Sequence, residues 1–178
     1  MERLVYREGI ATVLDAVRPR LNPRIVSRLQ AEAGIDAAAS RPSYPQASLD
    51  ALTRILAEEL YRGLPVDEAT FQLGVACLKH YEHTLLGKAL FPVVRLLGPL
   101  RVAKRLPGIF RQTNNYADVK VEVTSDRSWE LDHNEVGAYP HMIRGNMHGA
   151  GELLGWKNHK CELLSYDGHR ARYRMSWT

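Results

Sequence analysis

The sequence has few cysteines and no long apolar run. Cys77 and Cys161 are the two cysteines, too few for a disulfide framework or a cysteine-based zinc site. We therefore expect a reducing, cytoplasmic location. Met1 to Gly9 contains arginines and glutamates with no apolar run behind them, and no later segment reaches membrane-spanning length. We expect neither a signal peptide nor a transmembrane helix.

Acidic residues are missing from a long middle segment. No Asp or Glu occurs between Glu82 and Asp118, whereas six basic residues do: Lys88, Arg95, Arg101, Lys104, Arg105 and Arg111. Core packing below a solvated basic surface explains this composition, and we favour that reading over contact with an anionic membrane surface or an acidic ligand. We do not expect nucleic-acid binding, because the basic residues are not interleaved with aromatic stacking groups.

Signatures of catalysis are also missing. The sequence contains no glycine-rich phosphate loop, nucleophile elbow, zinc-protease motif or kinase motif. The glycines at 145 and 149 do not fit the dinucleotide fingerprint either. We therefore expect a protein that is not an enzyme and has no catalytic residue.

Helical periodicity dominates the first half of this 178-residue chain. Apolar residues spaced three and four apart predict helices over 10–17 and after Asn22, an N-cap followed by proline, as far as Gly34. Residues 35–46 read as an ordered connection without an element of its own. Ser48 is predicted to cap the next helix, which runs to about Leu60.

The central helix begins at Asp67. Its apolar series at helical spacing is Phe71, Val75, Leu78, Tyr81, Leu85 and Ala89. Beyond it, Pro92 and Pro99 divide the chain, because a proline inside a helix removes a backbone hydrogen bond. Two or three short helices are therefore predicted over 89–111.

From residue 116 the period changes from helical to alternating. Valines alternate with charged residues over 119–123, and Trp129 and Leu131 are predicted to share the inner face of the next strand. A helix over Pro140 to Leu154 follows, and two strands, 159–165 and 169–177, meet around the Asp-Gly pair at 167–168.

The register of this last hairpin follows from its hydrophobic pattern. A three-residue turn keeps the apolar residues away from the face that carries Arg170, Arg172 and Arg174. We therefore predict the pairs Leu163 with Ala171, Cys161 with Tyr173 and His159 with Met175. The arginine face would point to solvent or to a partner.

Together these patterns predict one α+β domain over 1–178. A helical half, 1–115, precedes a four-stranded antiparallel sheet of strand-strand-helix-strand-strand order over 116–178. One face of the sheet would be covered by helices.

Polar side chains on the central helix form the candidate site. Cys77, His80, Tyr81 and Thr84 lie on neighbouring turns and can converge on one cavity. His80 and His83 have no third ligand at a recognisable spacing, so no metal is predicted.

Short Gly- and Pro-containing motifs then point to a family. These are Leu60-Tyr61-Arg62-Gly63-Leu64-Pro65, Thr84-Leu85-Leu86-Gly87-Lys88, Leu97-Gly98-Pro99, Arg105-Leu106-Pro107, Asn114-Asn115 and Tyr173-Arg174-Met175-Ser176-Trp177. Their sequence resembles an uncharacterised family that is expanded as paralogues in myxobacteria. The resemblance implies relatives along most of the chain and no known chemistry.

The order of elements is further similar to a superfold shared by 4-vinyl-reductase sensor domains, TRAPP-type subunits and heme nitric-oxide-binding domains. This resemblance implies a pocket for a small molecule or acyl chain, or an assembly role. The Tyr-x-Ser-x-Arg signature that holds heme propionates and the cysteine cluster of zinc-containing phenol sensors are both missing. No cofactor is therefore predicted.

Three functional hypotheses remain. The first is a non-enzymatic sensory or ligand-binding module with an apolar pocket between the central helix and the sheet, where the ligand-binding residues would be His80, Tyr81, Thr84, Trp129 and Tyr173. The second is a homodimeric interaction or assembly module without a ligand. The third is a heme-based gas sensor that depends on His80 or His83.

Overall fold

The computed structural model describes residues 2–39 and 41–178, without the side chains of residues 85, 86 and 90. The helices are α1 (Arg7–Val17), α2 (Pro23–Ala33), α3 (Gln46–Leu60), α4 (Val66–His83), α5 (Leu85–Leu97), α6 (Pro99–Ala103), α7 (Leu106–Arg111) and α8 (Pro140–Leu154), with a 3-10 turn η1 (Arg18–Arg20). The strands are β1 (Leu4–Tyr6), β2 (Ser43–Pro45), β3 (Val119–Ser125), β4 (Ser128–His133), β5 (Lys160–Tyr166) and β6 (Ala171–Ser176).

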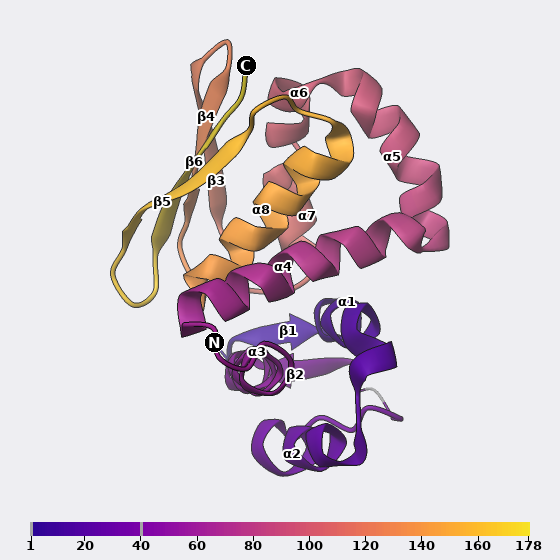
Figure 1. Ribbon diagram of the computed structural model, residues 1–178. Helices are drawn as coiled ribbons and strands as arrows, with labels where there is room; N and C mark the ends of the chain where they lie inside the picture. Colours follow the sequence, from indigo (N-terminus) through magenta and orange to yellow (C-terminus); the bar gives the residue numbers. More distant parts are fainter. Residues whose placement is uncertain (1, 40) are drawn as a thin grey trace.

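These elements form a helical part and a sheet part on opposite sides of α4 (Figure 1). The strand order of the sheet is β3-β4-β6-β5, and every pair is antiparallel. Helices cover one face of this sheet and leave the other open (Figure 1). The predicted α+β fold is confirmed.

The helical part begins as the caps predict. The Asn22 side chain accepts a hydrogen bond from the backbone N–H of Ile25, and Gly34 ends α2 in the left-handed conformation. Two details were wrong. Part of the connection over 35–46 is the strand β2, which pairs with β1, and α3 begins at Gln46 directly after Pro45, two residues before the predicted cap.

The central helix ends earlier than its apolar series predicts. α4 stops at His83, and α5 starts at Leu85, whose side chain lies outside the described residues. Thr84 has extended backbone angles, and its Oγ1 accepts a hydrogen bond from the Gly87 N–H at 3.0 Å. A Cβ at Gly87 would overlap the carbonyl oxygen of Tyr81, so glycine lets the chain reverse here.

The basic segment contains the predicted short helices. Pro99 occupies the first turn of α6, where a missing N–H costs no helical hydrogen bond, and Leu106 begins α7. Pro92 was expected to divide the segment but lies inside α5. The division falls instead at Gly98, which has a positive φ of 74°.

The sheet has the predicted inner and outer faces. Trp129 and Leu131 of β4 are 1% and 0% exposed and point toward the helices, as does Tyr173 of β6. On the outer face Glu130 is buried by two arginines, Arg172 and Arg174, whose guanidinium nitrogens each lie 2.7 Å from its carboxylate oxygens. The arginine-rich face is therefore neutralised in large part by strand-to-strand ion pairs.

The hairpin register differs from the prediction by two residues. Leu163 pairs with Tyr173 and Cys161 with Met175, and a bulge lies between Leu163 and Ser165. Because the shift is an even number, the same side chains still face inward. The longer connection, 167–170, is closed by two backbone N–H groups that donate to the Asp167 carboxylate.

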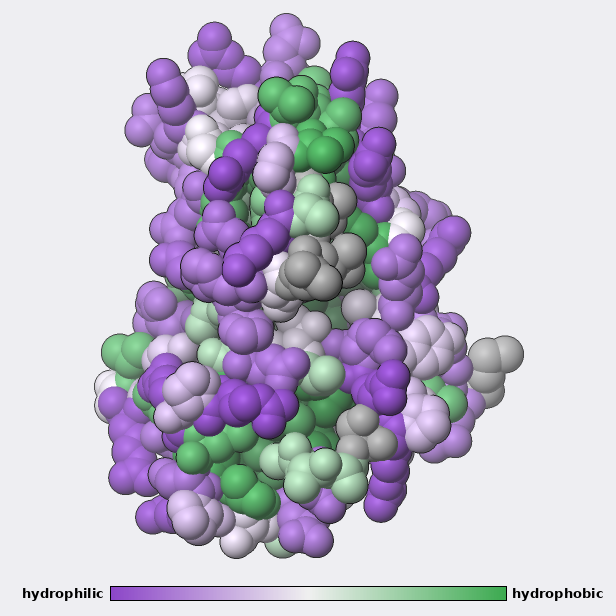
Figure 2. All heavy atoms as spheres, turned by 90° about the vertical axis from the view of Figure 1, so that its right-hand side faces the viewer, coloured by the Kyte–Doolittle hydropathy of each residue, from purple (hydrophilic) through white to green (hydrophobic). Residues whose placement is uncertain are grey.

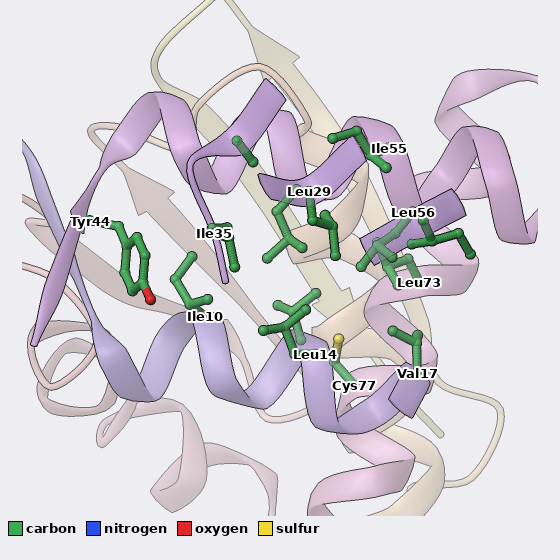
Figure 3. Packing of buried hydrophobic residues seen from close by; sticks show 14 of the residues in the cluster. Ile10, Leu14, Val17, Leu29, Ile35, Tyr44, Ile55, Leu56, Leu73 and Cys77 are labelled. Carbon is green, nitrogen blue, oxygen red and sulfur yellow. The ribbon is translucent and has the colours of Figure 1, made fainter. Parts of the chain in front are cut away.

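Two hydrophobic cores meet at α4 and α8. The first contains side chains from α1, α2, α3 and α4, including Leu14, Leu56, Leu73 and Cys77 (Figure 3). The second lies between the inner face of the sheet and helices α6 and α8. α8 contributes to both, through Met142 to the first core and Met147 to the second.

Glycines allow α4 and α8 to touch backbone to backbone. A Cβ added to Gly74 of α4 would overlap the carbonyl oxygen of Met142, and one added to Gly145 of α8 would overlap that of Phe71. Gly149, one turn further along α8, lies against Val75 and Leu78. The predicted helix over Pro140–Leu154 is confirmed, and these glycines fix its distance from α4.

None of the helices in the described part of the chain is long and apolar enough to cross a membrane.

The glycine contact predicts a large effect of one methyl group. Gly145→Ala should lower the free energy of unfolding by about 3 kcal/mol, because the helices must separate to admit the Cβ. Gly108→Ala in α7 is the matched control, since no atom lies within 4 Å of its added Cβ. It should leave stability unchanged or raise it by about 1 kcal/mol. Equal stability of the two variants in urea unfolding would contradict the contact.

Candidate functional site

The predicted site residues lie in two separate places. His80, Tyr81 and Thr84 are at the end of α4, where Tyr81 packs edge-on against Phe91 of α5 with ring centroids 6.1 Å apart. Thr84 Oγ1 lies 2.8 Å from the Tyr81 carbonyl oxygen and caps α5. Tyr81 and Thr84 therefore stabilise the turn between α4 and α5.

Trp129 and Tyr173 lie in the second core, under α8. The Tyr173 hydroxyl donates to the carbonyl oxygen of Pro140 at 2.8 Å, and burial raises the pKa of the phenol. The Trp129 indole N–H has no hydrogen-bond partner among the described residues. Because α8 packs between α4 and the sheet, these two aromatic residues do not share a cavity with His80, Tyr81 and Thr84.

One hollow lies on the outer face of the sheet and has a volume of about 390 Å³. It is lined by Asp132, Ser165, Tyr166, Asp167, Arg170 and Arg172. Arg170 Nε donates to Asp132 Oδ1 at 2.6 Å, and this ion pair lowers the pKa of the carboxyl group. The arginines that line this hollow are therefore already paired with carboxylates of the protein, Arg170 with Asp132 and Arg172 with Glu130.

A second hollow, of about 210 Å³, lies between α1 and the segment 36–44. Ile10 and Leu14 form part of its lining, with Asp15 and Arg18 also contributing. The Tyr44 hydroxyl, on the opposite side, accepts a hydrogen bond from the Arg41 N–H at 2.9 Å. This hollow is partly apolar, unlike the first.

A buried polar junction joins the helical part to the loop after β4. The Asp50 carboxylate accepts hydrogen bonds from Gln46 Nε2 and from the Ala138 N–H, each at 3.2 Å. Burial raises the pKa of Asp50, and the nearby Glu135 carboxylate raises it further. Glu135 is itself paired with Arg3 at 2.7 Å.

Sequence reasoning missed this junction. Gln46 and Asp50 are four residues apart and so share one face of α3, which is the local signal that could have paired them. The other partner of Asp50, the Ala138 N–H, lies in a loop 88 residues away, and no local pattern identifies it.

Several histidines of the described chain make contacts within the protein. The His133 ring packs edge-on against Phe110 with ring centroids 4.9 Å apart, and its Nδ1 accepts a hydrogen bond from the Glu135 N–H. The His148 and His159 rings lie tilted with centroids 4.6 Å apart, and both His159 nitrogens face backbone carbonyl oxygens. No group of three or more His, Cys, Asp or Glu side chains among these residues is arranged to hold a metal ion.

Comparisons with known proteins place the chain in a family and a fold. The model of the family described as "Protein of unknown function (DUF2378)" matches residues 3–178. No curated protein matches the sequence.

The fold is similar to that of solved structures that include H-NOX domains. An oxygen-binding H-NOX domain related to soluble guanylate cyclases is 11% identical and aligns over 97% of this chain and 95% of its own, with a TM-score of 0.66. An Fe(II) unliganded H-NOX mutant from K. algicida is 14% identical over 97% and 96%, with a TM-score of 0.62. A structure described for heme redox potential and porphyrin distortion is 13% identical over 97% and 95%, with a TM-score of 0.69.

Neither of these two hollows fits a heme. A protein-bound heme needs a deep slot and an axial His, Cys, Met or Tyr aimed at the iron. No His, Cys or Met lines either hollow, and the hydroxyls of Tyr44 and Tyr166, which do, are hydrogen-bonded to the backbone. The region between α4 and the sheet is filled by α8.

His133 predicts a pH dependence of stability. Burial lowers its pKa from 6.5 to about 4, so the unfolded chain binds this proton first as the pH falls. The free energy of unfolding should therefore decrease by about 3 kcal/mol between pH 6.5 and about pH 4 on account of this residue.

His133→Asn tests this, because its amide oxygen can replace Nδ1 as an acceptor and does not titrate. The variant is expected to be less stable than the native protein at neutral pH and to approach it near pH 4, as measured by urea unfolding across the pH range. Parallel pH curves for the two proteins would contradict the assignment.

Proposed function

This chain belongs to the DUF2378 family and has the fold of H-NOX domains, and we propose that it is a non-enzymatic sensory module that works without heme and binds its ligand or partner at its surface. The observation that carries the proposal is the packing of α8 onto α4 and the sheet. The Tyr173 hydroxyl donates a hydrogen bond to the Pro140 carbonyl oxygen and Met147 is only 5% exposed, so α8 packs closely against the sheet.

The state of the nucleophilic and acidic groups supports a non-enzymatic role. Burial raises the pKa of both Cys77 and Cys161 to about 12, which keeps the thiols protonated and unreactive at neutral pH. The carboxylates of Glu130 and Asp132 are held by arginines that lower their pKa. A general acid or base would instead need a pKa close to the working pH.

A small apolar or acyl ligand is favoured at one place, the hollow between α1 and the segment 36–44. Its walls combine aliphatic side chains, Ile10 and Leu14, with the Tyr44 phenol and a charged pair at Asp15 and Arg18. Sparse polar groups around an apolar lining are typical of small-molecule sites. At about 210 Å³ this hollow suits a small ligand better than a large cofactor.

Absorbance and native mass spectrometry of the protein purified from its own host test both parts of the proposal. We expect no Soret band, because no histidine lines either of the two hollows described above. We expect an extra mass that disappears on denaturation, either a small ligand or a partner chain. Ala11→Trp, which fills the α1 hollow, should remove a small-ligand mass, whereas Ala31→Trp on the exposed side of α2 should not.

Two results would contradict the proposal. One such result is a Soret band, at one heme per chain, that His80→Ala or His83→Ala abolishes. It would support the heme-sensor hypothesis instead. A bare monomer from the host, with neither ligand nor partner, would remove the support for binding at the surface.

A further inference from the structure

α5 exposes an apolar strip that no other part of the described chain covers. Leu96 is 86% exposed and Val93 55%, and Ala89 and Pro92 on the same side of the helix are also exposed. Spacings of three and four residues place these four side chains on one continuous face. Figure 2 views the molecule from the side of α5 and shows apolar atoms gathered toward one end of that face, with hydrophilic residues around them.

Positive charge lies beside this strip and beyond its end. Lys88 lies along its edge, and Arg101, Lys104 and Arg105 follow directly beyond the end of α5, all exposed. No Asp or Glu occurs anywhere from residue 83 to 117. We define the basic apolar face as these four cations together with the α5 strip.

The rest of the molecule holds the face in place. Arg95, on the edge of the strip, donates from Nε to the Leu153 carbonyl oxygen of α8 at 2.9 Å. Arg95 Nη2 donates to the Glu82 carboxylate of α4 at 3.0 Å. α5 is thus fixed to both central helices with its apolar side outward, and the strip does not need to unfold to be presented.

We infer that the basic apolar face docks on a membrane surface rich in anionic lipid, with the α5 strip in the acyl boundary and the cations at the headgroups. An amphipathic helix with aliphatic residues on one side and Lys and Arg beside them has this binding mode. Each cation near an anionic leaflet adds to the attraction. The inference goes beyond the proposed function and does not depend on a ligand in the α1 hollow.

Charge argues against a second copy of the chain as the occupant. In a two-fold symmetric dimer the same patch faces itself, which would bring Lys88, Arg101, Lys104 and Arg105 against their own equivalents. The strip also offers no hydrogen-bonding group between Ala89 and Leu96 on its outer side, and a protein partner ordinarily needs such groups for specificity. Lipid needs none.

Vesicle sedimentation tests the inference with the full-length protein. We expect binding to vesicles of phosphatidylcholine and phosphatidylserine in equal parts and little binding to phosphatidylcholine alone. Leu96→Asp and the double variant Arg101→Glu with Lys104→Glu should each weaken partition at least about tenfold, and added salt should weaken it as well.

The controls carry changes of the same kind elsewhere on the surface. Leu64→Asp, at an apolar side chain 45% exposed between α3 and α4, and Arg127→Glu in the β3–β4 turn should bind as the native protein does.

The inference is overturned if the native protein sediments with neither vesicle, or if the controls lose as much binding as Leu96→Asp. It is also overturned if sedimentation velocity without lipid shows a dimer that Leu96→Asp dissociates, because a second copy then covers the face. A failed vesicle test leaves the native-mass result standing, so the two proposals fail separately.

Discussion

The backbone contact between α4 and α8 is the constraint on which the rest of the structure depends. Gly74 and Gly145 bring the two helices closer than any side chain would allow. At that distance α8 reaches both hydrophobic cores at once, with Met142 in one and Met147 in the other. The helical part and the sheet part therefore share the α4–α8 pair. A substitution at this contact should disturb the packing of both cores.

The same contact decides where the protein can bind other molecules. α8 occupies the layer between α4 and the sheet. The carbonyl oxygen of its first residue, Pro140, accepts a hydrogen bond from the Tyr173 hydroxyl. The interior is filled with aromatic and aliphatic side chains in a fold that its H-NOX neighbours share over 95% or more of their length. What this chain presents instead lies at the periphery: a partly apolar hollow beside α1 and a basic apolar face on α5 and α6.

Local signals in the sequence predicted local structure well. Asn22 as a cap, the span of the helix from Pro140 to Leu154 and the inward Trp129 each depend on residues within a few positions of one another. The strand β1 was missed because it is three residues long and pairs with residues nearly 40 positions away. The hairpin kept its faces but shifted by two residues. The connection over 167–170 is longer than predicted and a bulge lies near Leu164, and hydrophobic alternation shows neither feature.

The candidate site was harder to predict than the fold. The spacing of His80, Tyr81 and Thr84 correctly predicted that they lie close together at the end of the central helix. Periodicity cannot show that Thr84 ends this helix, or that α8 packs between the helix and the sheet. That arrangement follows from Gly74 meeting Gly145 across 70 residues of chain, a long-range match between two small residues with no sequence signature of its own. Gly145 and Gly149, which do not fit the dinucleotide fingerprint, are packing residues.

Hydrogen exchange of the native protein tests the closed interior most directly. If α4 and α8 form one rigid axis, the amides around Leu73 and those around Met147 should be among the slowest to exchange and should respond equally to added denaturant, because both open only on global unfolding. Exchange of α8 that is much faster than that of α4 would contradict the account. It would mean that α8 swings away from the sheet and opens the layer between them, which would return the ligand site to the interior.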